Sequence, residues 1–392
     1  MLDRLTRGLA AISLALGLVA TTDDARAAAP IRIGAFLAMT GSSSFLGDPE
    51  AKTLRLYVDR INAAGGLNGS NLELVVYDTT GSVDQAIDQA LRLIDKDKVD
   101  LLIGGSTTQE TAPVLDLVEA RQIPLISLAA GFALMDTVRK WVFAVPHSDR
   151  MAVRHVFEDL QRRNLHGIGI IGGYGYYDSA CRGSARSLAP EYHVSILADQ
   201  SFGRFGTPTD TVPYLKAIKA TEGVQAILDC GFGESMVAVA HDYRALGMTG
   251  LPLYFTQGIA SARFIEAAQG AAEGIRLPVS AVLVADQLPA DNLQVPVAMA
   301  YRAAYSEAYK EPVSAFGGHA YDALMLAADA IKRSPAAPTP AQLRDALEQT
   351  KGLVGAGGVF TMSPTDHRGV TKKTLYMAEV RDGKWKLLAG AR

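Results

Sequence analysis

Short apolar runs alternate with amphipathic helical stretches along most of this 392-residue chain. In the first third, apolar runs at 31–37, 72–77 and 101–103 are separated by stretches at 49–63 and 83–95 whose apolar residues recur at helical spacing. Short apolar runs of this kind are typical of parallel strands that are buried on both faces. The order strand, helix, strand, helix therefore predicts an α/β fold with a parallel sheet covered by helices on both faces.

The same alternation starts again after Pro146, which predicts a second sheet of the same type. The expected strands lie at 168–171, 194–198, 224–228 and 253–255, and the expected helices at 151–162, 179–188, 213–220 and 235–246. From Pro278 the chain is irregular, and helices are expected again at 295–310 and 316–332. A chain of this length suggests two domains. Two βα domains in succession would leave a cleft between their strand ends.

Two junctions in the first third combine a strand end with small and hydroxyl residues. The segments 104–108 (Gly-Gly-Ser-Thr-Thr) and 127–131 (Ser-Leu-Ala-Ala-Gly) each follow a short apolar run. Open α/β sheets bind ligands at the carboxyl ends of their strands. We expect uncovered backbone N–H groups at these junctions, which would bind a small anion or a carboxylate without any catalytic side chain.

The first 27 residues resemble a secretory signal peptide. Arg4 and Arg7 precede an apolar stretch at 8–20, and Ala25-Arg26-Ala27 fits a small-x-small cleavage site. A buried N-terminal helix is the alternative, but it would not explain this order. No later apolar run reaches the ~20 residues that span a bilayer, so we expect a secreted protein cleaved near Ala27 without a membrane anchor.

Composition and motifs disfavour several classes of function. The net charge of −3 gives no electrostatic support to a nucleic-acid partner. The stretch 173–178 begins like a dinucleotide fingerprint, but Asp178 stands where Gly or Ala is needed. There is no Gly-x-Ser-x-Gly, P-loop or His-Glu-x-x-His motif, and the seven His and two Cys show no zinc-site spacing. We expect no enzyme, no cofactor and no metal site.

The two cysteines, Cys181 and Cys230, leave two interpretations open. If their strands are neighbours in one doubly wound sheet, both thiols lie near one edge of the same domain, and a disulfide is compatible with that geometry. The alternative is two buried free thiols. We favour the free thiols, because two-domain chains of this size do not need a covalent staple.

Several motifs together resemble one protein family. They are Ile31-Arg32-Ile33-Gly34, Thr40-Gly41 with Leu46-Gly47, the run 61–69 (Ile-Asn-Ala-Ala-Gly-Gly-Leu-Asn-Gly) and Ile103-Gly104-Gly105-Ser106. This order resembles the branched-chain amino acid type of periplasmic substrate-binding protein over essentially the whole mature chain. Later segments, 256–260, 316–322 and Asp366-His367-Arg368-Gly369, are similar to the branch of that family that takes up aromatic and other organic acids.

The resemblance implies the type I periplasmic binding protein fold, with two doubly wound parallel-sheet lobes joined by a three-segment hinge. The crossovers would lie near Pro146, Leu277 and Gly355. Lobe 1 would comprise 28–146 and 278–355, and lobe 2 would comprise 147–277 and 356–392. Such a protein is a periplasmic monomer whose lobes close on a small-molecule ligand and deliver it to the permease subunits of an ABC importer in the inner membrane.

The resemblance also implies a split binding site, carried over by position. The first-lobe contacts would come from the turn around Leu46 and from two further turns that hold a ligand carboxylate, at Ser106 and Thr107 and at Ala129, Ala130 and Gly131. The family usually has a hydroxyl residue where Gly131 stands and an aromatic where Leu46 stands. Both departures imply a pocket shaped differently from that of an amino-acid binder.

The second-lobe contacts would come from a Tyr-Gly turn, from a strand end and from the turn after the next strand. Here these are Tyr174 or Tyr176, Phe232 and Gln257. The alignment of the tyrosines is ambiguous, since Tyr174-Gly175 and Tyr176-Tyr177 each match the family pattern. Either ring would stack on a flat ligand and donate from its hydroxyl.

Gln257 differs from the residue that the family usually has at this position, and the difference indicates the class of ligand. Amino-acid binders of this family have a carboxylate there, and a buried ammonium without such a partner is costly. We therefore expect an organic acid without an amino group, an aromatic carboxylate, with Gln257 bonding a hydroxyl, a carbonyl or a second carboxylate oxygen. Alternatively, Gln257 is only a polar residue at the cleft edge. His319 either faces the cleft or caps or packs a helix start, and we expect the second.

Two other functions remain open on the same fold. One is the binding of branched-chain or other amino acids or amides. The other is a sensor that reports ligand occupancy to a partner protein, because the difference between sensing and transport lies on the outer surface.

Overall fold

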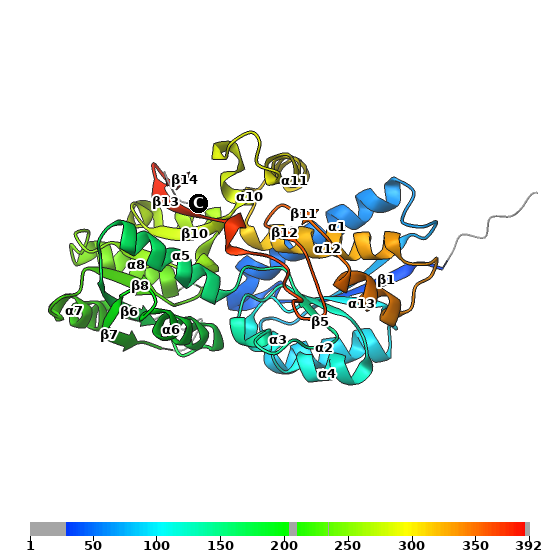
Figure 1. Cartoon of the computed structure of the whole chain (residues 1–392), viewed down its shortest axis with the longest axis horizontal. Coiled ribbons are helices and arrows are strands. Elements are labelled where there is room, and N and C mark those ends of the chain that lie inside the picture. The colour runs from blue at the N-terminus through cyan, green and yellow to red at the C-terminus, as the bar shows by residue number, and fades with distance from the viewer. Residues whose placement is uncertain (1–28, 204–209, 234, 389–392) are drawn as a thin grey trace, which may run out of the picture.

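The protein is an elongated molecule of two lobes lying side by side (Figure 1). This computed structural model describes residues 29–203, 210–233 and 235–388. The expected signal peptide, 1–27, lies outside the described residues. No helix in the described part of the chain is long and apolar enough to span a membrane.

The sheet of the first lobe is parallel, as the alternating pattern predicts. Over the described residues it has the strand order β2-β1-β3-β4-β5. Its strands are β1 (Ile31–Leu37), β2 (Leu72–Asp78), β3 (Leu101–Gly104), β4 (Leu125–Ser127) and β5 (Val142–Ala144). The strand order reverses between β1 and β3, and such a switch point is where doubly wound sheets bind ligands.

Helices cover both faces of this sheet, and each face has its own apolar core. One face is covered by α1 (Ser44–Ala63) and α12 (Ala315–Arg333), and the other by α2 (Val83–Asp95) and α4 (Val114–Arg121). A short helix, α3 (Thr108–Thr111), follows β3, and α13 (Pro340–Glu348) packs on α12. The expected helices at 49–63, 83–95 and 316–332 are thus confirmed, whereas the sequence pattern missed α13.

The second lobe repeats this design and adds two antiparallel strands. Within the described part of the chain its strand order is β14-β13-β10-β9-β8-β6-β7. The strands are β6 (Gly167–Gly172), β7 (Ser195–Ser201), β8 (Ala226–Asp229), β9 (Leu253–Phe255), β10 (Arg276–Ser280), β13 (Leu375–Arg381) and β14 (Lys384–Leu387). The last two pair antiparallel. The order reverses between β6 and β8, so this sheet has its own switch point.

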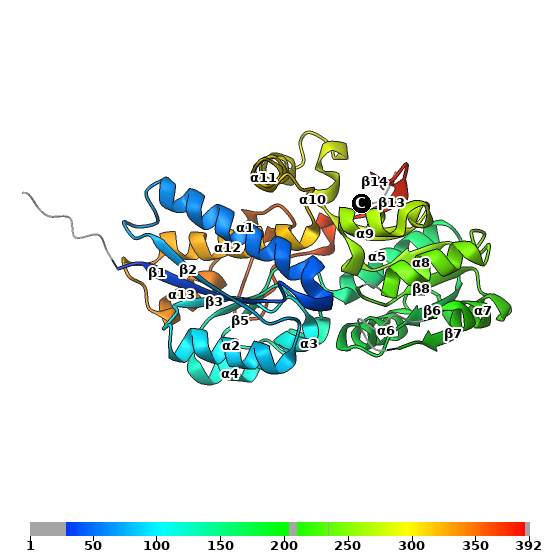
Figure 2. The same cartoon turned by 180° about the vertical axis from the view of Figure 1, so that it is seen from behind.

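Both faces of the second sheet are also covered. One face carries α5 (Asp149–Arg162) and α6 (Tyr176–Leu188), and the other carries α7 (Val212–Ala220), α8 (Ser235–Ala245) and α9 (Ala262–Ala268). From behind, α10 (Ala281–Val284) and α11 (Gln294–Tyr309) lie above the junction of the lobes (Figure 2). They contact β14 of the second lobe and α1 of the first.

The chain passes between the lobes at three places, two of which differ from the sequence prediction. The predicted crossover at Pro146 lies between β5 and α5. The predicted boundary at 277/278, however, lies inside β10, which pairs with β9 and β13. The boundary at 355/356 is also too early, because the hairpin of β11 (Leu353–Val354) and β12 (Val359–Phe360) leads into Met362 and Val370, which pack in the first-lobe core. We propose crossovers after Ser280 and between Val370 and β13 instead.

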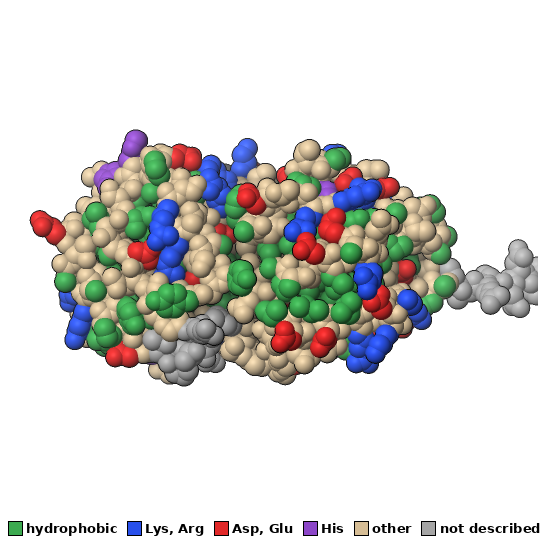
Figure 3. Space-filling model, turned by 90° about the horizontal axis from the view of Figure 1, so that it is seen from below, with side chains coloured by type: hydrophobic (Ala, Val, Ile, Leu, Met, Phe, Trp, Pro, Cys, Tyr) green, Lys and Arg blue, Asp and Glu red, His purple; other side chains and the backbone are tan. Residues whose placement is uncertain are grey.

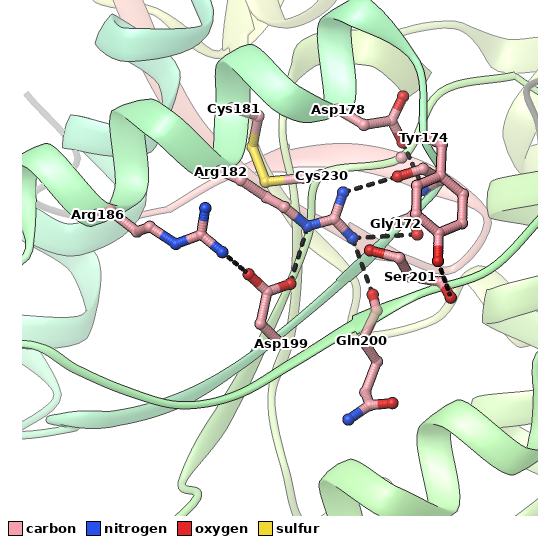
Figure 4. A network of polar contacts seen from close by, with 12 residues as sticks. Gly172, Tyr174, Asp178, Cys181, Arg182, Arg186, Asp199, Gln200, Ser201 and Cys230 are labelled. Atoms are coloured by element: carbon pink, nitrogen blue, oxygen red, sulfur yellow. Dashed lines mark hydrogen bonds and ion pairs between the residues drawn. A yellow bond between two sulfur atoms is a disulfide. The ribbon is translucent and has the colours of Figure 1, made fainter.

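Cys181 and Cys230 form a disulfide in the second lobe. It joins α6 to the residue that follows β8 (Figure 4). The expectation of two free thiols is therefore wrong. The strand order explains why, since β6 and β8 are neighbours and the helix that follows β6 lies against the end of β8. Both cysteines are fully buried.

Charges are interspersed over the surface. Seen from below, Lys and Arg side chains alternate with Asp and Glu side chains over both lobes (Figure 3). No single sign of charge dominates this face, in agreement with the net charge of −3.

Candidate functional site

A cavity lies between the lobes at the two switch points. It encloses about 670 Å³ of space, part of which is open to solvent. Both lobes line it, through Ser43, Leu46, Gly81, Ser106, Thr107, Thr108, Gln109, Leu128, Ala130, Phe316 and His319 from the first and Gly175, Tyr176, Tyr177, Asp178, Phe232, Gln257 and Gly258 from the second. The structure thus brings Leu46, Ser106, Thr107, Ala130, Tyr176, Phe232 and Gln257 together, as the sequence predicts. Ala129, Gly131 and Tyr174 do not line the cavity.

Two buried glutamates, Glu50 and Glu110, accept hydrogen bonds from the turn at Ser106 and Thr107. The Glu110 carboxylate accepts hydrogen bonds from the amides of Ser106 (2.6 Å) and Thr107 (3.2 Å). The Ser106 hydroxyl donates to Glu50 (2.5 Å) and accepts from the amide of Ala38 (3.0 Å). The expectation that the amides of Ser106 and Thr107 are uncovered is therefore wrong, because the capping carboxylate of α3 already occupies them.

The uncovered amides lie directly after this turn and in the second turn. Among the described residues, the backbone N–H groups of Thr108, Gln109 and Ala130 have no hydrogen-bond partner, and all three residues line the cavity. In the second turn, the Ala129 amide donates to the Ser127 hydroxyl (3.1 Å) and the Gly131 amide donates to the Thr108 hydroxyl (3.2 Å). Uncovered amides are thus present at both junctions, at Thr108 and Ala130 within the predicted segments and at Gln109 just beyond the first.

Thr108 also explains the glycine at 131. A Cβ atom on Gly131 would lie 2.5 Å from Cγ2 and 2.9 Å from Oγ1 of Thr108. The Thr108 side chain thus occupies the space that a larger residue at 131 would need. Thr108 therefore brings a hydroxyl to the turn where Gly131 has none.

The two glutamates beneath the turn carry perturbed acidities. Burial raises the pKa of Glu50 to about 8 and that of Glu110 to about 7. Hydrogen bonds from Ser106 to Glu50 and from Thr107, Thr79 and Ser106 to Glu110 oppose this rise without cancelling it. At neutral pH the Glu50 carboxyl is largely protonated, so the floor of the site carries less negative charge than its composition suggests.

Of the two predicted tyrosines, Tyr176 lines the cavity and Tyr174 does not. Tyr174 is 69% exposed, and its hydroxyl donates to the Ser201 carbonyl (3.5 Å; Figure 4). Tyr176 and Tyr177 begin α6 and line the cavity. Tyr177, which the sequence analysis did not select, is buried and donates to the Thr256 hydroxyl (2.8 Å).

Aromatic rings form one wall of the cavity. The Phe232 ring lies 5.6 Å from that of Tyr177 and 5.4 Å from that of Phe45, measured between centroids. Phe45 belongs to the first lobe and also contacts Phe316 at 5.7 Å. This tilted aromatic cluster therefore crosses between the lobes and offers ring edges and faces to a flat ligand.

Asp178 is a buried carboxylate in the cavity lining. In the sequence it stood out only as the residue that does not fit a dinucleotide-binding motif. It accepts a hydrogen bond from the Gly173 amide (2.5 Å). Burial raises its pKa, and the Gly173 amide opposes the rise. The Arg182 guanidinium bonds the Gly172 and Gly173 carbonyls and holds the same loop (Figure 4).

Gln257 presents a hydrogen-bond acceptor to the cavity. It begins a short 3-10 helix after β9 and is 6% exposed. Its Nε2 donates to the His147 carbonyl (2.8 Å), which sets the orientation of the amide. Its Oε1 is buried and, among the described residues, has no hydrogen-bond partner. A buried unpaired acceptor is costly, so this atom is suited to a donor on a ligand.

His319 lies in the lining rather than only packing at a helix start. It is buried in the first turns of α12, and its Nδ1 has no partner among the described residues. Burial lowers its pKa to about 4, so the ring is neutral at neutral pH. The sequence signal was the glycine pair before it, which lets the helix approach Val282 and Tyr301 closely.

The comparisons with known proteins agree with this architecture. A family model described as a periplasmic binding protein matches residues 30–384. The chain belongs to the periplasmic binding protein family. Membership identifies it as a ligand-binding protein rather than an enzyme, and the family is extracytoplasmic.

Curated relatives match over a limited stretch. The Leu/Ile/Val-binding protein homolog 8 of Brucella abortus is 34% identical over 129 residues, which are 32% of this chain and 31% of that protein. A leucine-, isoleucine-, valine-, threonine- and alanine-binding protein of Pseudomonas aeruginosa is 28% identical over 125 residues, 32% of this chain and 33% of that protein. The matched stretch thus spans about a third of these relatives.

Solved structures match over both lobes and confirm the type I fold. A branched-chain amino acid transporter substrate binding protein of Streptococcus pneumoniae, in complex with isoleucine, has a TM-score of 0.80 and 25% identity. An extracellular ligand-binding receptor of Rhodopseudomonas palustris has a TM-score of 0.83 and 24% identity. Each match covers 92% of this chain and 99% of the other.

Proposed function

We propose that this periplasmic binding protein captures a small organic acid, an aromatic carboxylate, between its lobes and delivers it to the permease of an ABC importer. The periplasmic location, the cleavage near Ala27, the monomeric state and the permease partner are part of this proposal. They follow from the family and from the resemblance of 1–27 to a signal peptide.

Gln257 is the observation that carries the choice of ligand. An ammonium group would need a carboxylate partner, and this position offers a neutral amide oxygen. Because Nε2 donates to the His147 carbonyl while Oε1 has no partner among the described residues, the ligand should present a donor to Oε1. This favours a hydroxyl over the carbonyl or second carboxylate that the sequence left open.

The first-lobe side of the cavity suits a carboxylate. The amides of Thr108, Gln109 and Ala130 have no partner among the described residues and would donate to its oxygens, as charge-assisted hydrogen bonds. The lining also contains Phe232, Tyr177 and the aliphatic side chains of Leu46 and Leu128. An aromatic ring with a carboxylate at one end and a hydroxyl at the other satisfies each of these groups.

Thermal-shift screening tests this ligand class. We expect benzoate and hydroxybenzoates to raise the melting temperature, and leucine, isoleucine and valine to leave it unchanged. A ligand at about 100 times its Kd stabilises a protein by about 2.7 kcal/mol, which such a screen detects. Stabilisation by leucine without any response to the acids would overturn the proposal.

Replacing Gln257 with alanine tests the acceptor. Gln257→Ala should weaken the binding of 4-hydroxybenzoate by about 1 kcal/mol or somewhat more, the value of one buried hydrogen bond, as measured by isothermal titration calorimetry. Benzoate, which lacks the hydroxyl, should lose less. Gln85→Ala, on the exposed side of α2, serves as the matched control. Equal losses for both ligands would remove Gln257 from the hydroxyl end.

Amino-acid binding is the second candidate. The names of the curated relatives favour it, and Asp178 places a carboxylate in the lining. Asp178 already accepts from Gly173, however, which leaves it less able to pair with an ammonium. Leucine in the thermal-shift screen separates the two candidates. A sensing role on the same fold is distinguished by the neighbouring genes, which would encode a kinase or response regulator instead of a permease and an ATPase.

A further inference from the structure

The motif Asp366-His367-Arg368-Gly369 is anchored to the first lobe. The His367 ring stacks on Phe143 of β5 at 4.1 Å between centroids, and its Nδ1 lies 2.9 Å from the Val142 carbonyl. The His367 carbonyl accepts from the Ala144 amide (3.0 Å). The motif therefore lies alongside the edge strand β5, directly beside the first crossover.

Arg368 extends from this anchor into the hinge. Its side chain is buried, and its guanidinium donates to the Pro146 carbonyl in the first crossover and to the Gly131 carbonyl (3.4 Å) in the turn beside the cavity. None of the ion pairs between described residues includes Arg368. Burial lowers its pKa to about 10, with Asp149 and Asp366 opposing the change, so the group stays charged at neutral pH.

The next carbonyl along the crossover is held from the other lobe. The His147 carbonyl accepts from Gln257, which lines the second-lobe half of the cavity. Asp149, at the start of α5, holds the same first-lobe turn, since its amide donates to the Ala130 carbonyl (3.2 Å) and its carboxylate accepts from the Phe132 amide (2.5 Å). Consecutive carbonyls of one hinge segment are thus bonded by Arg368 and by Gln257.

We propose that Arg368 is a positioning residue that sets the two halves of the cavity relative to one another through the Pro146 and His147 carbonyls. The continuous series of contacts runs from Gly131 through Arg368 and the crossover to Gln257. The statement that these halves bind one ligand rests on the proposed function, whereas the positioning role rests on the hinge contacts alone. A lysine at 368 would present a single point charge and would not replace the planar fork that reaches two carbonyls.

Distance measurements between the lobes test this role without a ligand. Spin labels at Asp88→Cys in the first lobe and Glu222→Cys in the second report the distance, because both positions are exposed and the native cysteines are buried in the disulfide. In pulsed electron-electron double resonance, we expect Arg368→Met to widen the distance distribution at least twofold. Arg368→Lys should widen it as well.

Arg381→Met, on β13 and exposed, is the matched control and should keep the wild-type width. Circular dichroism verifies folding, and if Arg368→Met does not fold, Arg368→Lys decides. Wild-type widths in the folded variants would overturn the positioning role. Benzoate is the ligand probe for a second arm. If wild-type protein does not respond to benzoate, the proposed ligand class fails, while the ligand-free widths still decide the role of Arg368.

Discussion

Replacing Cys181 and Cys230 together with alanine is expected to lower the free energy of unfolding of the second lobe by roughly 4 kcal/mol. The two residues are 49 positions apart. Opening a loop of that length restores chain entropy to the unfolded state, and the loop-entropy relation gives about 4 kcal/mol at 25 °C. Urea unfolding of the double variant against wild-type protein, with the slope compared as well as the midpoint, measures the change.

Reduction of the wild-type protein provides the control. Both sulfurs are buried, so a mild thiol should reduce the native protein slowly and the unfolded protein quickly. A double variant with wild-type stability would mean that the native disulfide is balanced by strain or by structure in the unfolded chain. The disulfide also links α6, which carries Tyr177, to the segment after β8 that carries Phe232, so the variant should bind its ligand more weakly.

Stability should fall as the pH rises from about 6.5 to 8.5, and Glu50→Gln should remove part of this fall. Burial raises the pKa of Glu50 from its ordinary 4.5 to about 8. Between these values the folded protein retains a proton that the unfolded chain has lost, so stability decreases with rising pH. At about 1.36 kcal/mol per pH unit, the Glu50 contribution between pH 6 and 8 is roughly 2 to 3 kcal/mol.

Other buried groups also make stability depend on pH, and they set the pH range in which the Glu50 contribution can be measured. Glu110, Asp322 and Asp229, whose pKa values are raised to about 7, 7 and 8, act in the same direction. His147 and His319, with pKa values lowered to about 3 and 4, act in the opposite direction below pH 6.5, where the unfolded histidines bind protons.

Above pH 6.5 the pH dependence of stability therefore reports the carboxyl groups without the histidines. Melting temperatures of wild-type protein and Glu50→Gln across pH 5.5–8.5 make the comparison, and glutamine can still accept from the Ser106 hydroxyl. Parallel curves would contradict the acidity assigned to Glu50. Exposed Glu222→Gln, in the turn after α7, is the matched control and should follow the wild-type curve.

The strands of both lobes could be predicted from the sequence because buried parallel strands have a strong local pattern. Every strand expected at 31–37, 72–77, 101–103, 168–171 and 253–255 is present, since each is a short apolar run between helices. The crossovers at 277 and 355 were misplaced because strand pairing, not local pattern, decides to which sheet a segment belongs. β13 and β14 mix charged and apolar residues, and β13 pairs with the distant strand β10.

The site was less predictable because side chains from other positions decide which of its backbone amides are already hydrogen-bonded. The sequence located the correct turns, yet Glu110 occupies the amides of Ser106 and Thr107 and leaves those that follow uncovered. The capping pattern Thr107-x-x-Glu110 was a readable signal for this. In contrast, the contact between Thr108 and Gly131 depends on the packing of two strand ends that sequence spacing does not define.

The position of β13 between β10 and the edge strand β14 has a consequence for how the chain reaches its native state. β13 lies between β10 and β14, and its pairing with β10 joins residues about 100 positions apart. A chain that ends before Leu375 leaves β10 as an open edge that invites pairing with another chain. Contacts this distant in sequence form slowly. The sheet of the second lobe is therefore completed only when residues 375–387 are available, so folding of this lobe must follow synthesis of β13 and β14.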